Sequence, residues 1–355
     1  MHNTVFFGPA VVDIHVKILA AVWRSLTRFW PAKLDAWFNI QLGGAICHAA
    51  AAYQLVAGDH PLAVPLVAAD VLGNVVEELL SKKFDVRRAN VADATRLSLI
   101  LPQPTNPGAT TAITCRPNIT LTAAHDSVAP YLAHARSLFL GSFEARHTEL
   151  LERILDMFTG TTYLMVTRSQ LQDRERTRAL LKRVTYVQMN AAELRDFTGK
   201  ASIIEGIASL RAEGCQSIIV TDGPYGVVAY AAGRWWYASS LAVELVSDIG
   251  GGDTVGGAIL GGVARGRDFG DVLRCAMAVA AKKVSHASTY GTWEELRQFY
   301  HTTPHLPPRP AKRTLAIEHV VAAAMSHPIM TTAIGSTAAL IALIGAAYGS
   351  VFVGV

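Results

Sequence analysis

The stretch SDIGGGDTVGGA, residues Ser247–Ala258, follows a mostly apolar run, Leu241–Val246, that predicts a strand, and it leads into an apolar segment that predicts a buried helix. Its three consecutive glycines, Gly250, Gly251 and Gly252, permit backbone conformations that a Cβ forbids and leave their N–H groups open to a ligand. A helix start adds unpaired N–H donors and the positive end of the helix dipole. We therefore expect an anion site at this turn.

Asp253 stands at the edge of the glycine turn. A carboxylate beside an anion site is suited to handling a proton rather than to binding the anion itself. Two other interpretations are a tight turn with Asp253 as the helix N-cap and a dinucleotide fingerprint, although the latter normally follows the first strand of a βαβ unit. The sequence contains no G-x-x-x-x-G-K-[ST] motif, which argues against a P-loop enzyme.

Length and composition indicate one large α/β domain. A chain of 355 residues can bury a sizeable core, and its net charge of +4 is spread along the sequence without a basic block, so no nucleic-acid partner is expected. The four cysteines lie far apart, and no signal peptide precedes the first predicted strand. We therefore expect a cytoplasmic, reduced catalytic domain. The 12 histidines form no H-E-x-x-H or similar metal spacing, so no zinc site is expected.

The C-terminal end differs from the rest of the chain. Hydrophobic residues make up 51% of the sequence, which calls for a search for a membrane segment, and residues 329–355 are 27 in a row without charge or histidine. Residues 304–328 are predicted to form a linker and a short helix, with basic residues on the side that a cytosolic domain requires. Several threonines and glycines make residues 329–355 only moderately hydrophobic. A membrane anchor, a docked helix and a disordered end all stay open.

The N-terminal part predicts a strand followed by a lid. Thr4–Ile14 reads as one buried strand that ends in the carboxylate Asp13, and open α/β sheets bind ligands at such strand ends. We expect a small β lid from about residues 14–42 and 94–118, because Thr95–Leu101 and Thr110–Cys115 alternate as an antiparallel pair. The aromatic residues of 15–42 are more often a packing cluster than a ligand surface.

A glycine pair, Gly43 and Gly44, precedes an alanine-rich helix, so a second helix start is open to close approach. His48 lies one turn inside this helix. A lone histidine in such a place is usually a satisfied core or rim residue, and a functional role is the alternative.

Strands and helices alternate from Ser137 onward, which is typical of right-handed βαβ units around a parallel sheet. The expected strands are Leu62–Ala68, Ser137–Leu140, Thr162–Val166, Thr185–Met189 and Ser217–Thr221, followed by a hairpin of Val227–Tyr230 and Arg234–Ala238. The expected helices include Thr148–Phe158, Arg174–Lys182, Ala192–Phe197, Ile203–Glu213, Asp271–Ala287 and Thr292–His301.

Two short polar motifs follow predicted strands. Asn190 and Glu193 have the spacing of a helix cap, which is the commoner meaning, and a carboxylate that holds waters around Mg²⁺ is the alternative. Thr221–Gly226 reads first of all as a turn.

In this order, these pieces resemble the ribokinase-like (PfkB) carbohydrate kinase family over about residues 4–300. The matching elements are the strand to Asp13, the Gly43-Gly44 pair, Asp70–Gly73 with Phe84–Val86, the N-x-x-E pair Asn190 and Glu193, the T-x-G turn from Thr221, and Gly250–Asp253 in place of G-A-G-D. The resemblance implies a ribokinase-like three-layer α/β sandwich over residues 1–303, with a mainly parallel central sheet and a small β lid.

The resemblance also implies roles for single residues. Asp253 would be the general base, with Gly250, Gly251 and Gly252 as the anion hole. The expected acceptor-binding residues are Asp13, Gly43, Gly44 and His48; the expected nucleotide-binding residues are Asn190, Thr221, Gly223 and Gly226; and Glu193 with Asn190 would hold Mg²⁺.

Three positions depart from the family's pattern. His48 stands where the family usually has asparagine, so the hydroxyl pattern that the site reads is expected to differ. Ser247–Ile249 replaces D-T-T, which puts potassium activation in doubt, and Met165–Arg168 lacks the aspartate common there.

The sequence thus predicts a kinase that uses ATP and Mg²⁺ to phosphorylate a hydroxyl of a small sugar or sugar-like substrate. The alternatives are a nucleoside kinase of the same fold and a non-catalytic sugar- or nucleotide-binding relative. A homodimer and a membrane contact through residues 329–355 are both compatible with the sequence. Asp253 is predicted to remain an anion at neutral pH without tuning by burial.

Overall fold

The computed structural model describes residues 3–17, 37–102, 110–285 and 292–308, and it contains two sheets. The larger, central sheet has the strand order β14-β13-β12-β11-β10-β9-β1-β4-β5, with β6 paired to β4. All of its strands run parallel except the hairpin of β13 and β14 at one edge. Its strands are β1 (Thr4–Pro9), β4 (Leu62–Val67), β5 (Asp85–Val86), β6 (Ala89–Asn90), β9 (Ser137–Leu140), β10 (Thr161–Met165), β11 (Tyr186–Asn190), β12 (Ser217–Thr221), β13 (Val227–Ala231) and β14 (Arg234–Ala238).

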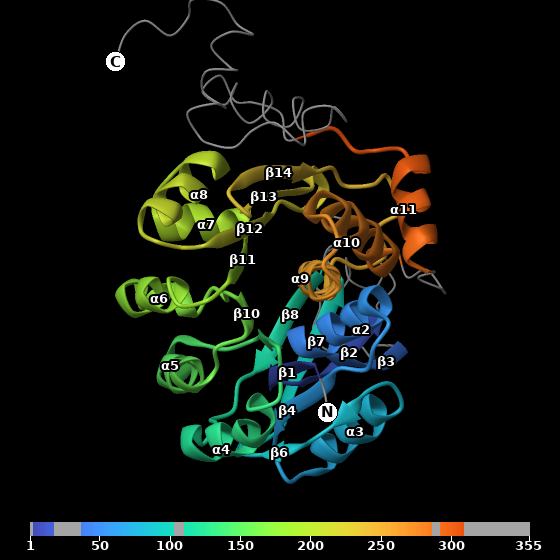
Figure 1. Ribbon diagram of the computed structural model, residues 1–355. Coiled ribbons are helices and arrows are strands. Elements are labelled where there is room, and N and C mark those ends of the chain that lie inside the picture. The colour runs from blue at the N-terminus through green and yellow to red at the C-terminus, as the bar shows by residue number, and fades with distance from the viewer. Residues whose placement is uncertain (1–2, 18–36, 103–109, 286–291, 309–355) are drawn as a thin grey trace, which may run out of the picture.

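Helices cover both faces of the central sheet, so the fold is the expected three-layer α/β sandwich (Figure 1). One face carries α4 (Leu121–Leu132), α5 (Thr148–Met157), α6 (Arg174–Leu181), α7 (Ala191–Thr198) and α8 (Ile203–Ala212). The other face carries α2 (Ala45–Ala57), α3 (Val71–Ser81), α9 (Gly251–Ala264), α10 (Phe269–Val284) and α11 (Trp293–Thr302).

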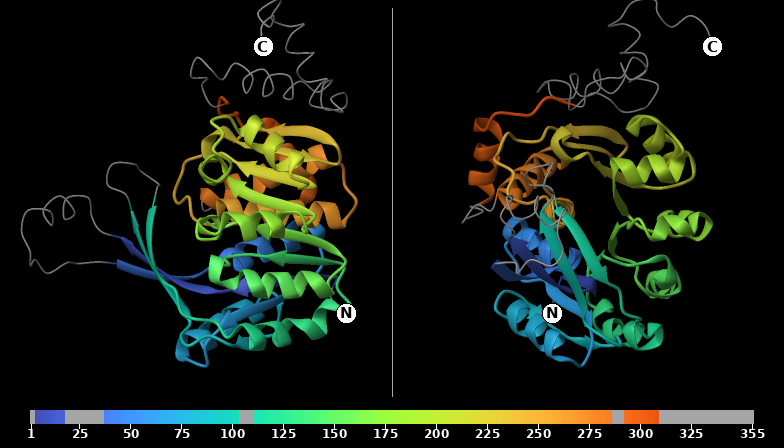
Figure 2. Two further views of the ribbon diagram at one scale, coloured as in Figure 1. Left: turned by 90° about the vertical axis from the view of Figure 1, so that its left-hand side faces the viewer. Right: turned by 180° about the vertical axis from the view of Figure 1, so that it is seen from behind.

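The second sheet confirms the small β element. It has four strands in the order β3-β2-β7-β8, namely β3 (Trp37–Gly43), β2 (Val11–Lys17), β7 (Arg96–Pro102) and β8 (Thr110–Cys115). In the left view of Figure 2 these strands extend sideways from the rest of the molecule. They begin beside the carboxyl ends of β1 and β4, where the ligand site of an open α/β sheet lies.

Three expectations about the elements were wrong. Thr4–Ile14 is not one strand: β1 belongs to the central sheet and β2 to the second sheet, with a single residue, Ala10, between them. Leu241–Val246 is not a strand, because only Leu241 is buried and bridged, to His305, whereas the apolar side chains after Glu244 are exposed. Helix α4 was missed altogether, and it contains Pro130, which lacks the N–H that a residue inside a helix normally donates.

The two helices that flank the expected site, α2 and α9, touch backbone to backbone. A Cβ at Gly257 of α9 would overlap the carbonyl oxygen of Ala49, and one at Gly261 would lie 3.0 Å from the carbonyl oxygen of Tyr53. Glycine at these positions therefore permits a distance between helix axes that larger residues exclude.

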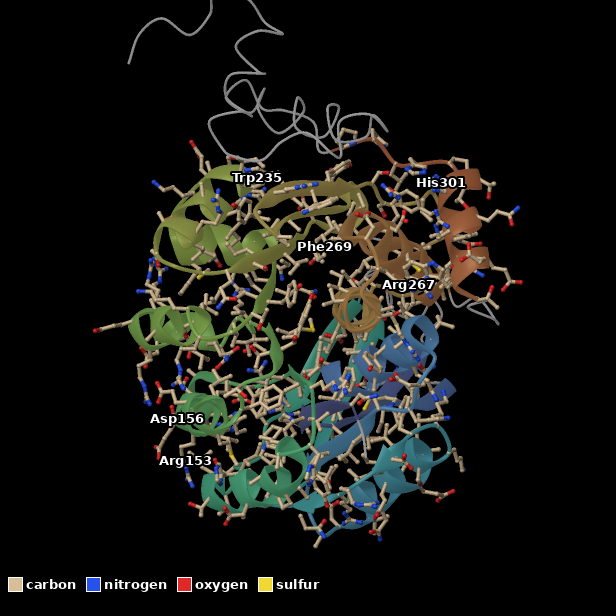
Figure 3. All side chains as sticks on the ribbon, viewed as in Figure 1. Arg153, Asp156, Trp235, Arg267, Phe269 and His301 are labelled. Atoms are coloured by element: carbon tan, nitrogen blue, oxygen red, sulfur yellow. The ribbon has the colours of Figure 1, made fainter. Side chains whose placement is uncertain are left out.

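A column of aromatic rings crosses the core between the sheet and α9–α10. Tyr163 stacks between Phe139, with a centroid distance of 5.5 Å, and Tyr186, with a distance of 5.8 Å. Phe269 at the start of α10 ends the column in the interior (Figure 3). These side chains are almost entirely out of solvent, apart from the half-buried Tyr186, and they fix β9, β10 and β11 against one another.

The expected C-terminal tail, residues 329–355, lies outside the described residues, as does most of the expected linker 304–328. Residues 304–306 run beside 240–242, where Ala242 N–H donates to the carbonyl of Pro304 at 2.7 Å. Within the ranges that the structure describes, none of the helices combines the length and the apolar character that crossing a bilayer requires.

Candidate functional site

The glycine turn does open a helix, as expected. Gly250 is the N-cap of α9 and has a φ of 77°, in the left-handed region that favours glycine. No side chain caps the helix start, and the N–H of Gly251 makes only a long hydrogen bond of 3.4 Å to the carbonyl of Asp248. Asp253 lies in the first turn and is not the N-cap, so the interpretation of Asp253 as a capping residue is wrong.

Burial changes the protonation of Asp253. Its pKa rises to about 6, because burial disfavours the charged form and the carboxylates of Asp13 and Glu193 add repulsion. The ammonium of Lys283 on α10 acts in the opposite direction. The expectation that Asp253 escapes tuning by burial was therefore wrong. With a pKa of about 6 the side chain is still mostly anionic at pH 7 and has become a stronger base.

Asp13 faces the same region from β2. Its side chain lies over Gly43, where any Cβ would overlap the carboxylate. Burial raises the pKa of Asp13 to about 6, against the opposing effects of a hydrogen bond from Ser98 and the charge of Lys283. Two carboxylates with pKa values near 6 thus face the site from β2 and from the start of α9.

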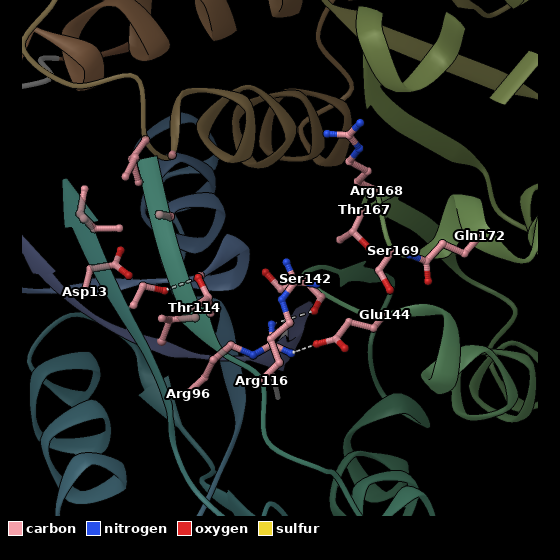
Figure 4. Close-up of a pocket in the computed structure, with 17 residues that line it drawn as sticks. Asp13, Arg96, Thr114, Arg116, Ser142, Glu144, Thr167, Arg168, Ser169 and Gln172 are labelled. Atoms are coloured by element: carbon pink, nitrogen blue, oxygen red, sulfur yellow. Dashed lines mark hydrogen bonds and ion pairs between the residues drawn. The ribbon is translucent and has the colours of Figure 1, made fainter. Parts of the chain in front are cut away.

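The first cavity, which we call the acceptor cavity, lies between the second sheet and the ends of β9 and β10 and has a volume of about 660 Å³ (Figure 4). Asp13 and Thr114 line it from the second sheet, and Arg168 approaches from the opposite side. The other lining residues are Val11, Gly44, Arg96, Ser98, Ile100, Ala112, Arg116, Ser142, Glu144, Thr167, Ser169, Gln172, Ile249 and Gly250.

A buried ion pair forms the floor of the acceptor cavity. Arg96 Nη2 lies 2.7 Å from Glu144 Oε1, and Arg96 Nη1 donates to the carbonyl of Ser142 at 3.2 Å. Arg96 is 7% exposed, and its Nε–H has no hydrogen-bond partner among the described residues. The Nε–H of Arg96 is therefore a buried donor without a partner in the described part of the chain, and the charge of the guanidinium is balanced by Glu144.

The second cavity, of about 290 Å³, adjoins the first through Ser142 and Gly250 and contains Asp253. Asn190, Glu193 and Thr221 line its other side. Asp253 thus lies with the N-x-x-E pair in one cavity, which borders the acceptor cavity.

Asn190 and Glu193 form a capping box, as the commoner meaning of their spacing predicted. Asn190 Oδ1 accepts from Glu193 N–H and Glu193 Oε2 accepts from Asn190 N–H, both at 2.8 Å. The other oxygen of Glu193, Oε1, has no hydrogen-bond partner among the residues that the structure describes. Burial raises the pKa of this carboxyl, and a bound cation would lower it again. In the described part of the chain no three acidic, histidine or cysteine side chains gather around one point. The residues therefore fit Mg²⁺ held mainly through water and phosphate oxygens.

His48 lines a third cavity, of about 670 Å³, together with Thr254 and Lys283, and not the acceptor cavity. Its Nε2 is buried without a hydrogen-bond partner among the described residues. Burial lowers the pKa of His48 to about 3, and the charge of Lys283 adds to the effect, so the ring is neutral. Its role as a hydroxyl-binding residue stays a prediction.

The structure brings most of the expected site residues together. Gly223 and Gly226 do not line the three cavities and form the turn between β12 and β13, where Asp222 N–H donates to the carbonyl of Gly226. Sequence reasoning missed Arg96, Arg116, Ser142, Gln188 and Lys283. The sequence held few signals for them: Arg96 is merely the second residue of a predicted strand, and the positive φ of Ser142 follows only from the folded loop.

Comparisons with known proteins show the family and the fold. Residues 38–296 match the model of the pfkB family carbohydrate kinases. The 1-phosphofructokinase of Escherichia coli K12 is 31% identical over 107 residues, and the cytidine kinase of Thermococcus kodakarensis is 27% identical over 126 residues. These alignments cover 29% and 35% of the chain and 34% and 44% of the relatives, so the chain spans less than half the length of the curated relatives it matches. The ribokinase of Thermotoga maritima superposes with a TM-score of 0.68 at 17% identity, over 85% of this chain and 100% of that one.

Proposed function

Because the chain belongs to the pfkB family of carbohydrate kinases, we propose that it transfers the γ-phosphoryl group of ATP to a hydroxyl of a small sugar or sugar-like substrate. One observation supports this most: Asp253 lies in the first turn of α9, in a cavity shared with Asn190 and Glu193 that opens toward the acceptor cavity. A base in one cavity that borders a second, larger cavity can reach an acceptor hydroxyl and a phosphate at the same time, as phosphoryl transfer needs.

In this mechanism Asp253 accepts the proton of the acceptor hydroxyl. At the same time the hydroxyl oxygen forms a bond to the γ-phosphorus of ATP. The bond from phosphorus to the bridging oxygen breaks, and ADP leaves. The N–H groups at Gly250, Gly251 and Gly252 stabilise negative charge on the transferred group. Bound Mg²⁺, held through Glu193 and Asn190 with water, would neutralise phosphate charge. Thr221, with the Gly223–Gly226 turn, would lie beside the nucleotide.

Asp13 and Gly44 are proposed to hold acceptor hydroxyls over Gly43, with His48 behind them. The guanidinium of Arg116 also lines the cavity, whereas that of Arg96 is paired with Glu144, and the charge of Arg116 favours an acceptor that carries a phosphate.

None of the described residues that line the acceptor cavity is aromatic, so the described part of the site lacks a surface for stacking a base. A non-catalytic relative is disfavoured because Asp253, the three glycines and Glu193 are all in place.

Coupled ADP release tests the proposal. Pentoses, hexoses, their monophosphates and nucleosides are offered with Mg-ATP to the full-length protein. We expect turnover with a sugar, highest for a sugar monophosphate. Turnover with nucleosides alone would establish the nucleoside kinase instead, and tight binding of ATP without turnover on any acceptor would establish the non-catalytic relative.

A further inference from the structure

Gln188 on β11 is a buried amide that bridges the central sheet and the start of α9. It is 1% exposed. Its Oε1 accepts a hydrogen bond of 2.6 Å from the hydroxyl of Tyr163, and its Nε2 donates one of 2.8 Å to the carbonyl oxygen of Gly252. Neither the sequence motifs nor the proposed mechanism uses this side chain.

The carbonyl of Gly252 can only accept a hydrogen bond, so it takes the NH₂ group of Gln188 and leaves the amide oxygen for the hydroxyl of Tyr163. The stack with Phe139 and Tyr186 fixes the ring of Tyr163, and burial raises the pKa of its phenol well above the usual range, so the hydroxyl stays protonated and donates. The oxygen of Gln188 therefore turns toward Tyr163 and the NH₂ group toward Gly252. The opposite orientation would set the amide oxygen against the carbonyl oxygen of Gly252.

The carbonyl of Gly252 belongs to the same planar peptide as the N–H of Asp253. Holding that carbonyl therefore fixes the peptide plane next to the proposed base. Glycine at position 256 permits the approach, since a Cβ there would lie 2.7 Å from Gln188 Oε1. A turn of three glycines without a side-chain cap can adopt many backbone conformations. The hydrogen bond from Gln188 to the carbonyl of Gly252 therefore restricts the turn considerably.

We propose that Gln188, bonded to Tyr163, is a positioning residue that holds the first turn of α9 in its active geometry. It acts through the carbonyl of Gly252. The inference rests on the proposed kinase reaction for its kinetic consequence, but the hydrogen bond itself can be tested without any substrate.

The kinetic test uses Gln188→Met, which keeps the length of the side chain and removes the donor, and Tyr163→Phe, which removes only the hydroxyl that bonds the amide oxygen. We expect kcat to fall about 10- to 100-fold in Gln188→Met and about 3- to 10-fold in Tyr163→Phe, as for a small displacement of reacting groups. KM for ATP and acceptor should stay within about threefold in both. The double variant should be no slower than Gln188→Met alone, because Tyr163 acts through the amide.

The structural test is amide hydrogen exchange of a peptide covering residues 247–258. Exchange should be faster in Gln188→Met and in Tyr163→Phe than in the wild type. Thr185→Val is the matched control, because Thr185 bonds Thr162 between the same two strands without touching α9. It should leave both exchange of this peptide and kcat unchanged.

Full kcat and unchanged exchange in a folded Gln188→Met protein would overturn the proposal. A raised KM for ATP at constant kcat would overturn it too, since Gln188 would then contact the nucleotide directly. If the wild type phosphorylates no acceptor, the proposed function fails, while the exchange experiment still decides whether Gln188 holds the turn.

Discussion

The imidazole of His48 occupies the space that a side chain at Gly250 would need, since a Cβ at Gly250 would lie 2.6 Å from Cδ2 of the ring. The histidine of α2 thus supports the N-cap of α9 from behind. Its position in a different cavity from Asp13 makes this support the better account of its presence.

For His48→Ala we therefore expect kcat to fall about tenfold with little change in KM for the acceptor, because the glycine turn loses the group it packs on. Steady-state kinetics with the acceptor found by the ADP-release panel give both constants. A raised KM at unchanged kcat would instead establish His48 as a hydroxyl-binding residue.

Replacing the proposed base gives the sharpest test of the mechanism. Asp253→Asn keeps the shape but cannot take a proton, so kcat should fall by about two to four decades while ATP still binds. Asp156→Asn, at an exposed carboxylate of α5 that pairs with Arg183, is the matched control and should leave kcat unchanged. Near-normal turnover of Asp253→Asn would remove the residue from the mechanism.

The same substitution should raise the melting temperature at pH 7. The pKa of Asp253 is higher in the folded chain, about 6, than the usual 3.8. The folded state therefore binds the proton more tightly, and its stability decreases as the pH rises from about 4 to 6. The neutral amide of the Asp253→Asn variant would mimic the protonated carboxyl at every pH. Equal melting temperatures at pH 7 would show that burial does not perturb this carboxyl.

The pH dependence of kcat should depend on the charge of Lys283. With Asp253 as the base, kcat is lost as the pH falls through about 6. Lys283 lowers the pKa of Asp253, whereas Asp13 and Glu193 raise it. Lys283→Met should therefore move the acid limb of the profile to higher pH, and Lys283→Arg should largely preserve it.

Lys282→Met is the control for this experiment, because Lys282 lies over the ring of Phe299 and does not affect Asp253. It should leave the profile in place. An acid limb that stays where it is in Lys283→Met would show that the ammonium has no influence on the base.

The arginines of the acceptor cavity predict discrimination between acceptors. Arg116→Gln removes an exposed guanidinium and should raise KM for a sugar monophosphate about tenfold, with little effect on the unphosphorylated sugar. Arg153→Gln on α5, away from the cavity, should change neither constant (Figure 3). Equal effects of Arg116→Gln on both sugars would argue against phosphate recognition.

The order of short motifs was enough to predict the family and the three-layer fold, because glycine turns, caps and strand periodicity are local properties. Leu241–Val246 shows the limit: its apolar composition matches a strand, yet whether it pairs depends on residues 304–306, about 60 positions away along the chain. The division of Thr4–Ile14 between two sheets could not be predicted either, because it depends on the distant strands with which each half pairs.

Some residues of the site could likewise be predicted from the sequence, and others could not. Asp253, Asp13 and Glu193 stand out in the sequence because each follows a recognisable turn or strand end. Gln188 and Lys283 do not, since a glutamine in a strand and a lysine in a helix gain meaning only from what folding brings opposite them. The raised pKa of Asp253 likewise comes from burial, which the helix-dipole argument alone does not include.

The glycine seam between α2 and α9 bears on how specificity can diverge. Since Gly257 and Gly261 rest on the backbone of α2, any larger side chain at either position would push the two helices apart. The starts of α2 and α9 are therefore inherited as one rigid unit. A lineage that changes its acceptor is left to vary the second sheet and the β9–α5 loop, where the walls of the cavity are side chains. Selection can thus alter the substrate while the phosphoryl chemistry stays constant.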